Sequence, residues 1–254
     1  METAIITGGG SGIGQALAWE MAERNVHVTV IGRQEKKLLS TQERFPGKIK
    51  IIIADISSEQ ECQKVIDSFT QSKIDYLIHN AGIIEPIVPL KQVGLKDWRK
   101  TFAVNVDSTL VLAQGLYQQL KGGRVLNISS GAAHHPIPSW AAYCCSKAAL
   151  FMLYQSWNAE QYDVAFGSVM PGIVDTNMQT AIRDSHFMPD ANHDFFKQLK
   201  QQGRLIPVST VAHFLAWLLM DTSLETFKEK EWDIYQRWHH AQWMQEADKV
   251  PELE

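Results

Sequence analysis

Three polar side chains between residues 127 and 150 have the types and spacing of an acid–base site. They are the hydroxyl of Ser130, the phenol of Tyr143 and the amine of Lys147. The segment after Pro138 contains no helix breaker, so it predicts a helix on which Tyr143 and Lys147 lie one turn apart on the same face. An ammonium near a phenol favours the phenolate, so we expect Lys147 to lower the pKa of Tyr143 from about 10 toward neutrality. Such a tyrosine can protonate a carbonyl oxygen, or deprotonate an alcohol, at cellular pH.

Ser130 follows the apolar run 124–128 and is placed to hydrogen-bond the same oxygen from the tip of a strand. A tyrosine and a lysine on one helix face are nevertheless common in proteins that use neither for catalysis. The rest of the chain must therefore decide whether these three residues form a site.

The composition indicates a globular α/β protein. Apolar residues make up 45% of the 254 and charged residues 20%, which is typical of a folded chain. The net charge of −4 offers no basic surface for nucleic acid or anionic lipid. The three cysteines form neither a disulfide framework nor a metal-ligand spacing. The chain enters a strand at once, without a leader, and has no apolar run of membrane-spanning length, so we expect a cytoplasmic protein.

Short apolar runs alternate with longer amphipathic ones along the chain. Strands are predicted at 3–7, 26–31, 49–54, 74–79, 124–129, 164–170 and 231–235, and helices at 13–24, 35–45, 58–71, 97–120, 140–161 and 207–220. This alternation predicts a doubly wound parallel sheet covered by helices on both faces. No repeat or linker interrupts it, so we expect one domain over residues 1–254.

A glycine-rich turn follows the first strand directly. The sequence T-G-G-G-S-G-I-G at residues 7–14 stands between a strand and a helix, where glycines let backbone N–H groups approach a pyrophosphate. The second strand ends without the acid that commonly binds the ribose 2′-hydroxyl of NAD, and Arg33 follows instead. An arginine suits a 2′-phosphate, so we expect NADP(H), with NAD(H) as the alternative.

Other polar residues stand at predicted strand ends, where open parallel sheets bind ligands. Asp55 follows the third strand, although it could instead cap the next helix, and Asn80, Ala81 and Gly82 follow the fourth. His79 is interpreted as a satisfied structural histidine. Asn105 lies inside a predicted helix, where asparagine has poor propensity, so its amide is expected to hold a water or kink the helix.

Three further segments have less specific patterns. His134 and His135 lack a third ligand at a metal-site spacing, and one of them is expected to line a substrate mouth. Residues 177–203 are polar and weakly periodic, as in a substrate lid. The tail 236–254 carries Trp238, Trp243 and Met244, which could mark a subunit interface or pack on the chain's own body.

Taken together in this order, these motifs resemble the short-chain dehydrogenase/reductases over residues 1–235. The matching positions are T-G-G-G-S-G-I-G at 7–14, N-A-G at 80–82, Asn105, Ser130, Y-C-C-S-K at 143–147 and P-G-I-V-D-T at 171–176. Two positions depart from the family pattern: His79 replaces an asparagine before N-A-G, and Ser11 stands where many NADPH-using members carry a basic residue.

The resemblance implies a Rossmann-type seven-stranded sheet of order 3-2-1-4-5-6-7 and hydride transfer between a nicotinamide and a carbonyl or alcohol. It implies that Tyr143 is the acid–base residue, Ser130 polarises the carbonyl, Lys147 lowers the tyrosine pKa and binds the nicotinamide ribose, and Asn105 holds a water. The implied cofactor contacts are Gly8, Ser11, Gly12, Ile13, Gly14, Arg33, Asp55, Ile56, Asn80, Ala81, Gly82, Tyr143, Lys147, Pro171, Gly172, Val174 and Thr176.

Within the family, residues 196–205 and 227–235 are similar to the sepiapterin reductase and benzil reductase group. This similarity implies an NADPH-dependent carbonyl reductase for a ketone such as a vicinal dicarbonyl or an aromatic ketone. The alternatives are an NAD(P)-linked alcohol dehydrogenase or 3-oxoacyl-thioester reductase, and a dinucleotide-sensing regulator without activity. The expected partners are a small-molecule substrate and further copies of the chain, in a homodimer or homotetramer.

Overall fold

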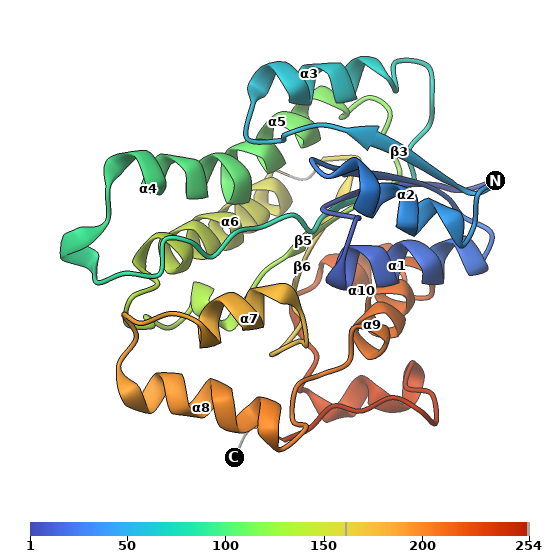
Figure 1. The fold of residues 1–254 in the computed structure, drawn as a ribbon. Coiled ribbons are helices and arrows are strands. Elements are labelled where there is room, and N and C mark those ends of the chain that lie inside the picture. The colour runs from blue at the N-terminus through green and yellow to red at the C-terminus, as the bar shows by residue number, and fades with distance from the viewer. Residues whose placement is uncertain (161, 253–254) are drawn as a thin grey trace.

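A computed structural model, which describes residues 1–160 and 162–252, has a seven-stranded sheet at its centre (Figure 1). Its order is β3-β2-β1-β4-β5-β6-β7, and every neighbouring pair is parallel. The strands are β1 (Thr3–Thr7), β2 (His27–Gly32), β3 (Ile49–Ile53), β4 (Tyr76–His79), β5 (Arg124–Ile128), β6 (Ala165–Met170) and β7 (Glu231–Asp233). The strand order predicted from the family resemblance is confirmed.

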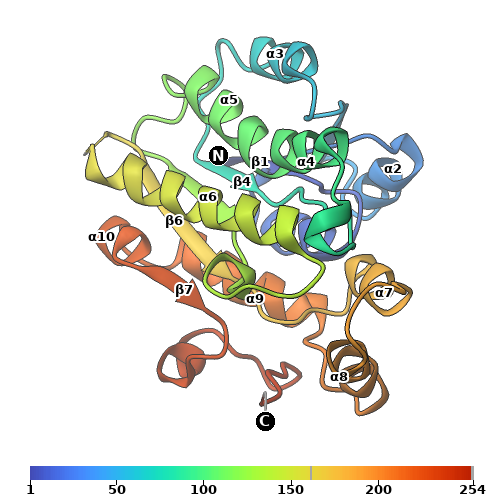
Figure 2. The same ribbon diagram turned by 90° about the vertical axis from the view of Figure 1, so that its left-hand side faces the viewer.

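Helices cover both faces of the sheet, as Figure 2 shows from the side. Buried side chains of α1, α2, α9 and α10 pack on one face, and those of α3, α5 and α6 pack on the other. The bounds are α1 (Gly12–Glu23), α2 (Glu35–Glu43), α3 (Glu59–Asp67), α4 (Leu95–Phe102), α5 (Ser108–Gly115), α6 (Ala141–Ala159), α7 (Asn177–Arg183), α8 (Asp190–Gln201), α9 (Val208–Met220) and α10 (Leu224–Lys228).

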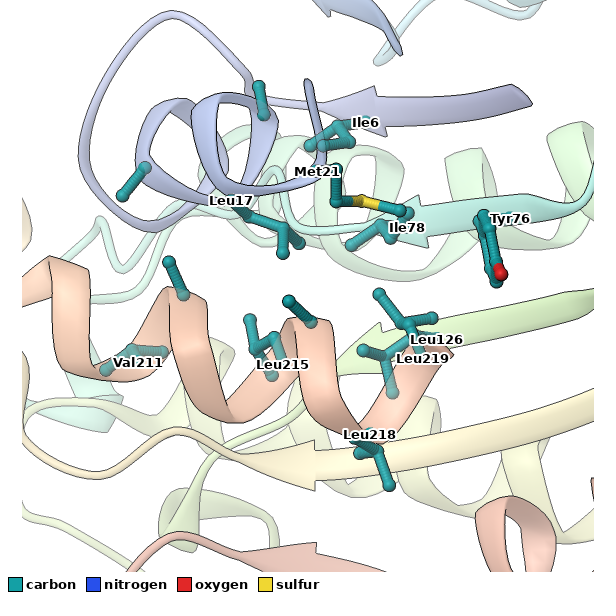
Figure 3. Packing of buried hydrophobic residues seen from close by; sticks show 14 of the residues in the cluster. Ile6, Leu17, Met21, Tyr76, Ile78, Leu126, Val211, Leu215, Leu218 and Leu219 are labelled. Carbon is teal, nitrogen blue, oxygen red and sulfur yellow. The ribbon is translucent and has the colours of Figure 1, made fainter. Parts of the chain in front are cut away.

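The best-packed interior lies between α1, α9 and the sheet. Leu17 and Met21 of α1, Leu215 of α9 and the strand residue Ile6 belong to one buried cluster (Figure 3). These four side chains are fully buried. Burial of a large apolar side chain is worth roughly 1.5 to 3 kcal/mol, so this contact anchors the helix that follows the glycine-rich turn.

Three predicted helices end differently in the structure. The helix expected at 58–71 becomes α3, which ends at Asp67. The helix expected at 97–120 is interrupted by a π-helical turn at Ala103–Asp107 and is no longer helical after Gly115. The helix expected at 140–161 becomes α6, which ends at Ala159; residue 161 lies outside the described residues. The helix after β3 is capped by Ser58, whose side chain accepts a hydrogen bond from the amide of Glu61. Asp55 is therefore not its cap.

The predicted lid and tail are ordered parts of the fold. Residues 177–203 contain α7 and α8, which lie side by side at one end of the sheet in both views (Figures 1 and 2). In the described part of the tail, His239 and Trp243 are buried against Phe214 of α9, whereas Trp238 is exposed. Residues 253 and 254 of the tail lie outside the described residues. No helix within 1–160 or 162–252 has the length and apolarity needed to cross a membrane.

Candidate active site

The carboxyl ends of the strands surround a cavity of about 380 Å³. This edge of a doubly wound sheet is where such folds bind ligands. Most of the predicted site residues converge here, although they come from distant parts of the chain. They are Gly8, Ser11, Gly12, Ile13, Arg33, Asp55, Ile56, Asn80, Ala81, Gly82, Ser130, Tyr143, Lys147, Pro171, Gly172, Val174 and Thr176. Gly14 and Asn105 are the predicted residues that do not line this cavity.

The glycine-rich turn has a backbone that other residues would strain. Gly8 and Gly12 have φ angles of 69° and 57°, in the left-handed region that favours glycine. Asn80 ties the turn to β4, because its amide donates to the carbonyl oxygens of Thr7 at 2.9 Å and Gly8 at 3.2 Å. A Cβ added at Gly14 would lie 2.4 Å from the Asn80 side-chain nitrogen. Gly14 therefore permits the close packing beneath the turn and does not face the cavity.

Tyr143 and Lys147 lie one turn apart on α6, and both are buried. The Lys147 amine donates to the carbonyl oxygen of Ile128 at 2.7 Å and lies 5.7 Å from the centre of the Tyr143 ring. This confirms the predicted juxtaposition.

The predicted effect on the tyrosine pKa is wrong for this structure. Burial raises the pKa of Tyr143 to about 12, and a hydrogen bond with Ser130 opposes the rise without cancelling it. Burial also lowers the pKa of Lys147 to about 8. Desolvation disfavours the charged form of each group. At neutral pH Tyr143 therefore holds its proton, and most Lys147 amines are charged.

Asn105 lies in the π-helical turn and supports the wall of the cavity from behind. Its side chain accepts from the amide of Ile83 and donates to the carbonyl of Ile83, both at 2.9 Å. The same amide donates to the Ser146 hydroxyl, which in turn donates to the carbonyl of Tyr143. The expectation that this amide has a task and distorts the helix is met. The contacts seen are with the backbone of the loop after β4 and with α6.

Two cations line the cavity near the ends of β2 and β3. Arg33 lies 3.8 Å from the Asp55 carboxylate, and Lys37 of α2 lines the same cavity. Burial favours the protonated form of Asp55, but hydrogen bonds from Ser57 and the charge of Arg33 outweigh this effect and lower its pKa. Sequence analysis missed Lys37. Its spacing of four residues from Arg33, at the start of a predicted helix, was the available signal.

A buried apolar cluster lies against Tyr143 and is formed by Trp140, which precedes α6, and by side chains of α7 and α8. Trp140 has its ring edge-on to Tyr143, with centroids 5.9 Å apart, and stacks on Phe196 of α8 at 5.5 Å. Ile182 of α7 belongs to the same buried cluster, and Met178 lines the cavity. Sequence analysis did not single out these four residues, because a weakly periodic segment does not indicate which side chains face inward.

The histidines do not behave as predicted. Neither His134 nor His135 lines the cavity; His134 instead contacts Glu231 of β7, and His135 is exposed. His79 is buried, but both ring nitrogens lack a hydrogen-bond partner among residues 1–160 and 162–252, so it is not a satisfied histidine. Burial lowers the pKa of His79 to about 3, which keeps the ring neutral.

Comparison with known proteins agrees with this geometry. The fold and the site define a dinucleotide-binding oxidoreductase. The short chain dehydrogenase family model matches residues 2–186, so the chain belongs to the short-chain dehydrogenase/reductase family and is an NAD(P)-dependent oxidoreductase.

Individual relatives cover most of the chain. An uncharacterised oxidoreductase of Schizosaccharomyces pombe is 33% identical over 86% of this chain and 91% of its own. A benzil reductase ((S)-benzoin forming) of Bacillus cereus is 31% identical over 86% of this chain and 94% of its own. The crystal structure of a short chain dehydrogenase/reductase of Saccharomyces cerevisiae superposes with a TM-score of 0.89 at 26% identity, over 96% of this chain and 100% of that one. The predicted similarity to benzil reductases is confirmed.

Proposed function

We propose that this protein is an NADPH-dependent carbonyl reductase that acts on an uncharged ketone such as a vicinal dicarbonyl or an aromatic ketone. The observation that carries the proposal is a protonated, buried Tyr143 that lies beside Ser130 and Lys147 at one end of a cavity. Arg33 and Lys37 border the other end. Reduction of a carbonyl needs a proton donor at neutral pH, and this tyrosine retains its proton there.

The cavity fits a nicotinamide dinucleotide. At Gly8, a Cβ would come within 2.9 Å of the Cα of Ala81. Glycine therefore lets the backbone of the turn lie close to the loop after β4. Gly12 and Ile13 begin α1, whose N-terminal amides suit a pyrophosphate. The ends of β3, β4 and β6 would hold the adenosine and nicotinamide halves through Asp55 and Ile56, Asn80 to Gly82, and Pro171 to Thr176. A bound cofactor would supply the hydride.

The 2′-phosphate of NADPH would bind beside Arg33 and Lys37. Two cations attract this dianion, and the carboxylate at this end, Asp55, is already paired with Arg33 at 3.8 Å. The presence of Lys37 adds to the argument for NADP(H), which from sequence rested on Arg33 and on the absence of an acid at the end of the second strand. NAD(H) remains the alternative cofactor.

Residues of the chain would then donate the proton and stabilise the negative charge that develops. Tyr143 would donate its phenolic proton to the carbonyl oxygen as negative charge develops there. The Ser130 hydroxyl would bond the same oxygen and stabilise that charge. Charged Lys147 would favour the phenolate that remains and bind the ribose. Asn105, through Ile83 and Ser146, would hold the wall of the cavity and the backbone of Tyr143 in place.

An apolar cluster beside Tyr143 supports an uncharged, preferably aromatic substrate. Met178 of α7 lines the cavity, and Trp140, Ile182 and Phe196 form the buried cluster with Tyr143; we propose that α7 and α8 act as the lid. The benzil reductase relatives are named for a dicarbonyl with two aromatic rings. We also propose a cytoplasmic homodimer or homotetramer, on the basis of family membership.

The two alternatives receive less support. A 3-oxoacyl-thioester reductase that binds a carrier protein should have a basic mouth, but Arg183, Lys197, Lys200 and Arg204 do not line the cavity, and Lys200 pairs with Asp175 at 2.7 Å. A silent dinucleotide sensor has no need of the Tyr143 and Lys147 pair that this chain keeps.

The test is the rate of NADPH and NADH oxidation with benzil, acetophenone and a 3-oxoacyl thioester. We expect turnover of benzil with NADPH and its loss in Tyr143→Phe. Lys37→Ala should raise the KM for NADPH at least several-fold while leaving the KM for NADH unchanged, and Lys36→Ala, an exposed neighbour on the same helix, serves as the control. No turnover by the wild type despite tight NADPH binding would contradict the reductase and favour the sensor.

A further inference from the structure

The residue that is proposed to polarise the carbonyl begins a short turn that ends at a histidine. Ser130 precedes the 3₁₀ turn Gly131–Ala133, and its hydroxyl accepts from the amide of Ala132 at 3.2 Å. The amide of Ala133 donates to the carbonyl of Ser130 at 2.9 Å, and that of His134 donates to Gly131 at 3.0 Å. Ser130 and His134 are thus the two ends of one closed turn, and a displacement of one end is transmitted to the other.

The far end of this turn is bonded to the edge strand of the sheet. The Nε2 atom of His134 lies 2.5 Å from Oε2 of Glu231, which belongs to β7 and is 97 residues away in the chain. The other oxygen, Oε1, accepts from the hydroxyl of Ser168 on β6 at 2.7 Å. Glu231 and Ser168 are also paired in the register of the two strands, so the carboxylate is anchored on two sides.

The two partners of this contact differ in burial, because the His134 side chain is 33% exposed. The Glu231 side chain is only 8% exposed, so its carboxylate needs hydrogen bonds in place of the water that it loses. Ser168 is fully buried and supplies one of them, and the His134 ring supplies the other. The ring is also held by an edge-on contact with Phe151 of α6, with centroids 4.7 Å apart. His134 therefore joins the Ser130 turn, the catalytic helix and β7.

We propose that His134, held by Glu231, is a positioning residue for Ser130. The Glu231 carboxylate fixes the His134 ring, the ring fixes the end of the turn, and the turn fixes the Ser130 hydroxyl opposite Tyr143. This inference rests on the proposed reductase function. Hydrogen bonds that stabilise developing charge are sensitive to displacements of about 1 Å, so a loosened turn lowers kcat more than it lowers cofactor binding.

The experiment is a double-mutant cycle on benzil reduction, with wild type, Ser130→Ala, His134→Ala and Ser130→Ala/His134→Ala. We expect His134→Ala to lower kcat about tenfold with an unchanged Kd for NADPH, measured by fluorescence. In the Ser130→Ala background the same change should lower kcat less than twofold, because the hydroxyl that it positions is gone. His134→Gln, which keeps a donor, should recover most of the kcat. His135→Ala is the control and should match the wild type, because this neighbour is exposed and outside the cavity.

The outcomes separate the inference from the function on which it rests. A tenfold loss in both backgrounds, or no loss in either, would refute the positioning role while turnover by the wild type still supports the reductase. No turnover by the wild type would refute the reductase and the positioning role together. If His134→Ala fails to fold, Glu231→Gln tests the same link, because it removes the carboxylate that fixes the ring. It should give the same loss of kcat and the same dependence on Ser130.

Discussion

Replacing Lys147 with methionine is expected to change how the stability of the protein depends on pH. Lys147 is 4% exposed, and burial lowers the pKa of its amine from 10.5 to about 8. The unfolded chain keeps the higher pKa, so between these values the unfolded state binds more protons than the folded state. The stability of the wild type therefore gains a contribution that is absent below pH 8 and grows as the pH rises to 10.5.

The size of this contribution follows from the pKa difference. At 1.36 kcal/mol per pH unit, full deprotonation of Lys147 in both states is worth about 3 kcal/mol, of which roughly 2 to 3 kcal/mol should be present by pH 10. Methionine has a similar length and no proton to lose. The free energy of unfolding of Lys147→Met, minus that of the wild type, should therefore fall by this amount between pH 7 and pH 10.

Urea unfolding followed by tryptophan fluorescence at pH 7, 8, 9 and 10 measures this difference, and subtraction removes the titrations that both proteins share. Lys197→Met, at an exposed position on α8, controls for the loss of one positive charge. If the difference in free energy of unfolding between Lys147→Met and the wild type stays constant across this pH range, burial does not lower the pKa of the Lys147 amine. The account of both pKa values in the site would then fail.

Three further changes test other parts of the site. Gly14→Ala should cost about 1 to 3 kcal/mol of stability and weaken NADPH binding, because the new Cβ would lie 2.4 Å from the side chain of Asn80; Gly47→Ala, with open space around it, should do neither. Asn105→Ala leaves a backbone amide and a backbone carbonyl unpaired, at on the order of 1 to 3 kcal/mol each, which chemical denaturation would detect. Phe196→Ala should raise the KM for benzil with little change in the KM for NADPH; equal changes in both would argue against a lid.

Local patterns were sufficient for most of the elements, whereas most of the residues around the cavity were implied by the family resemblance. The glycines at 8 and 12 adopt the positive φ angles that a turn between a strand and a helix requires. The spacing of Tyr143 and Lys147 placed both on one helical face, because the period of a helix is a local property. The poor helix propensity of Asn105 correctly marked a distortion, although the π-helical turn itself was not predicted.

The errors concern properties that depend on burial and on distant neighbours. The pKa of Tyr143 was expected to fall because of an adjacent charge, and it rises because the surrounding fold removes water from both groups. His79 was expected to be satisfied, yet the packing around it provides no partner among the described residues. Likewise, no local pattern could show that His134 contacts a carboxylate 97 residues later in the chain.

The sequence by itself determined the order of strands and helices along the chain, the glycine-rich turn and the placement of Tyr143 and Lys147 on one helical face. Each of these depends on the period of an element or on the backbone preference of a residue, which are set within a few positions. Only the tertiary structure decided that Lys37 joins Arg33 at the cavity, that Trp140 stacks on Phe196 and that His134 contacts Glu231. Those contacts join separate elements, and they form only when the burial of apolar surface brings the elements together.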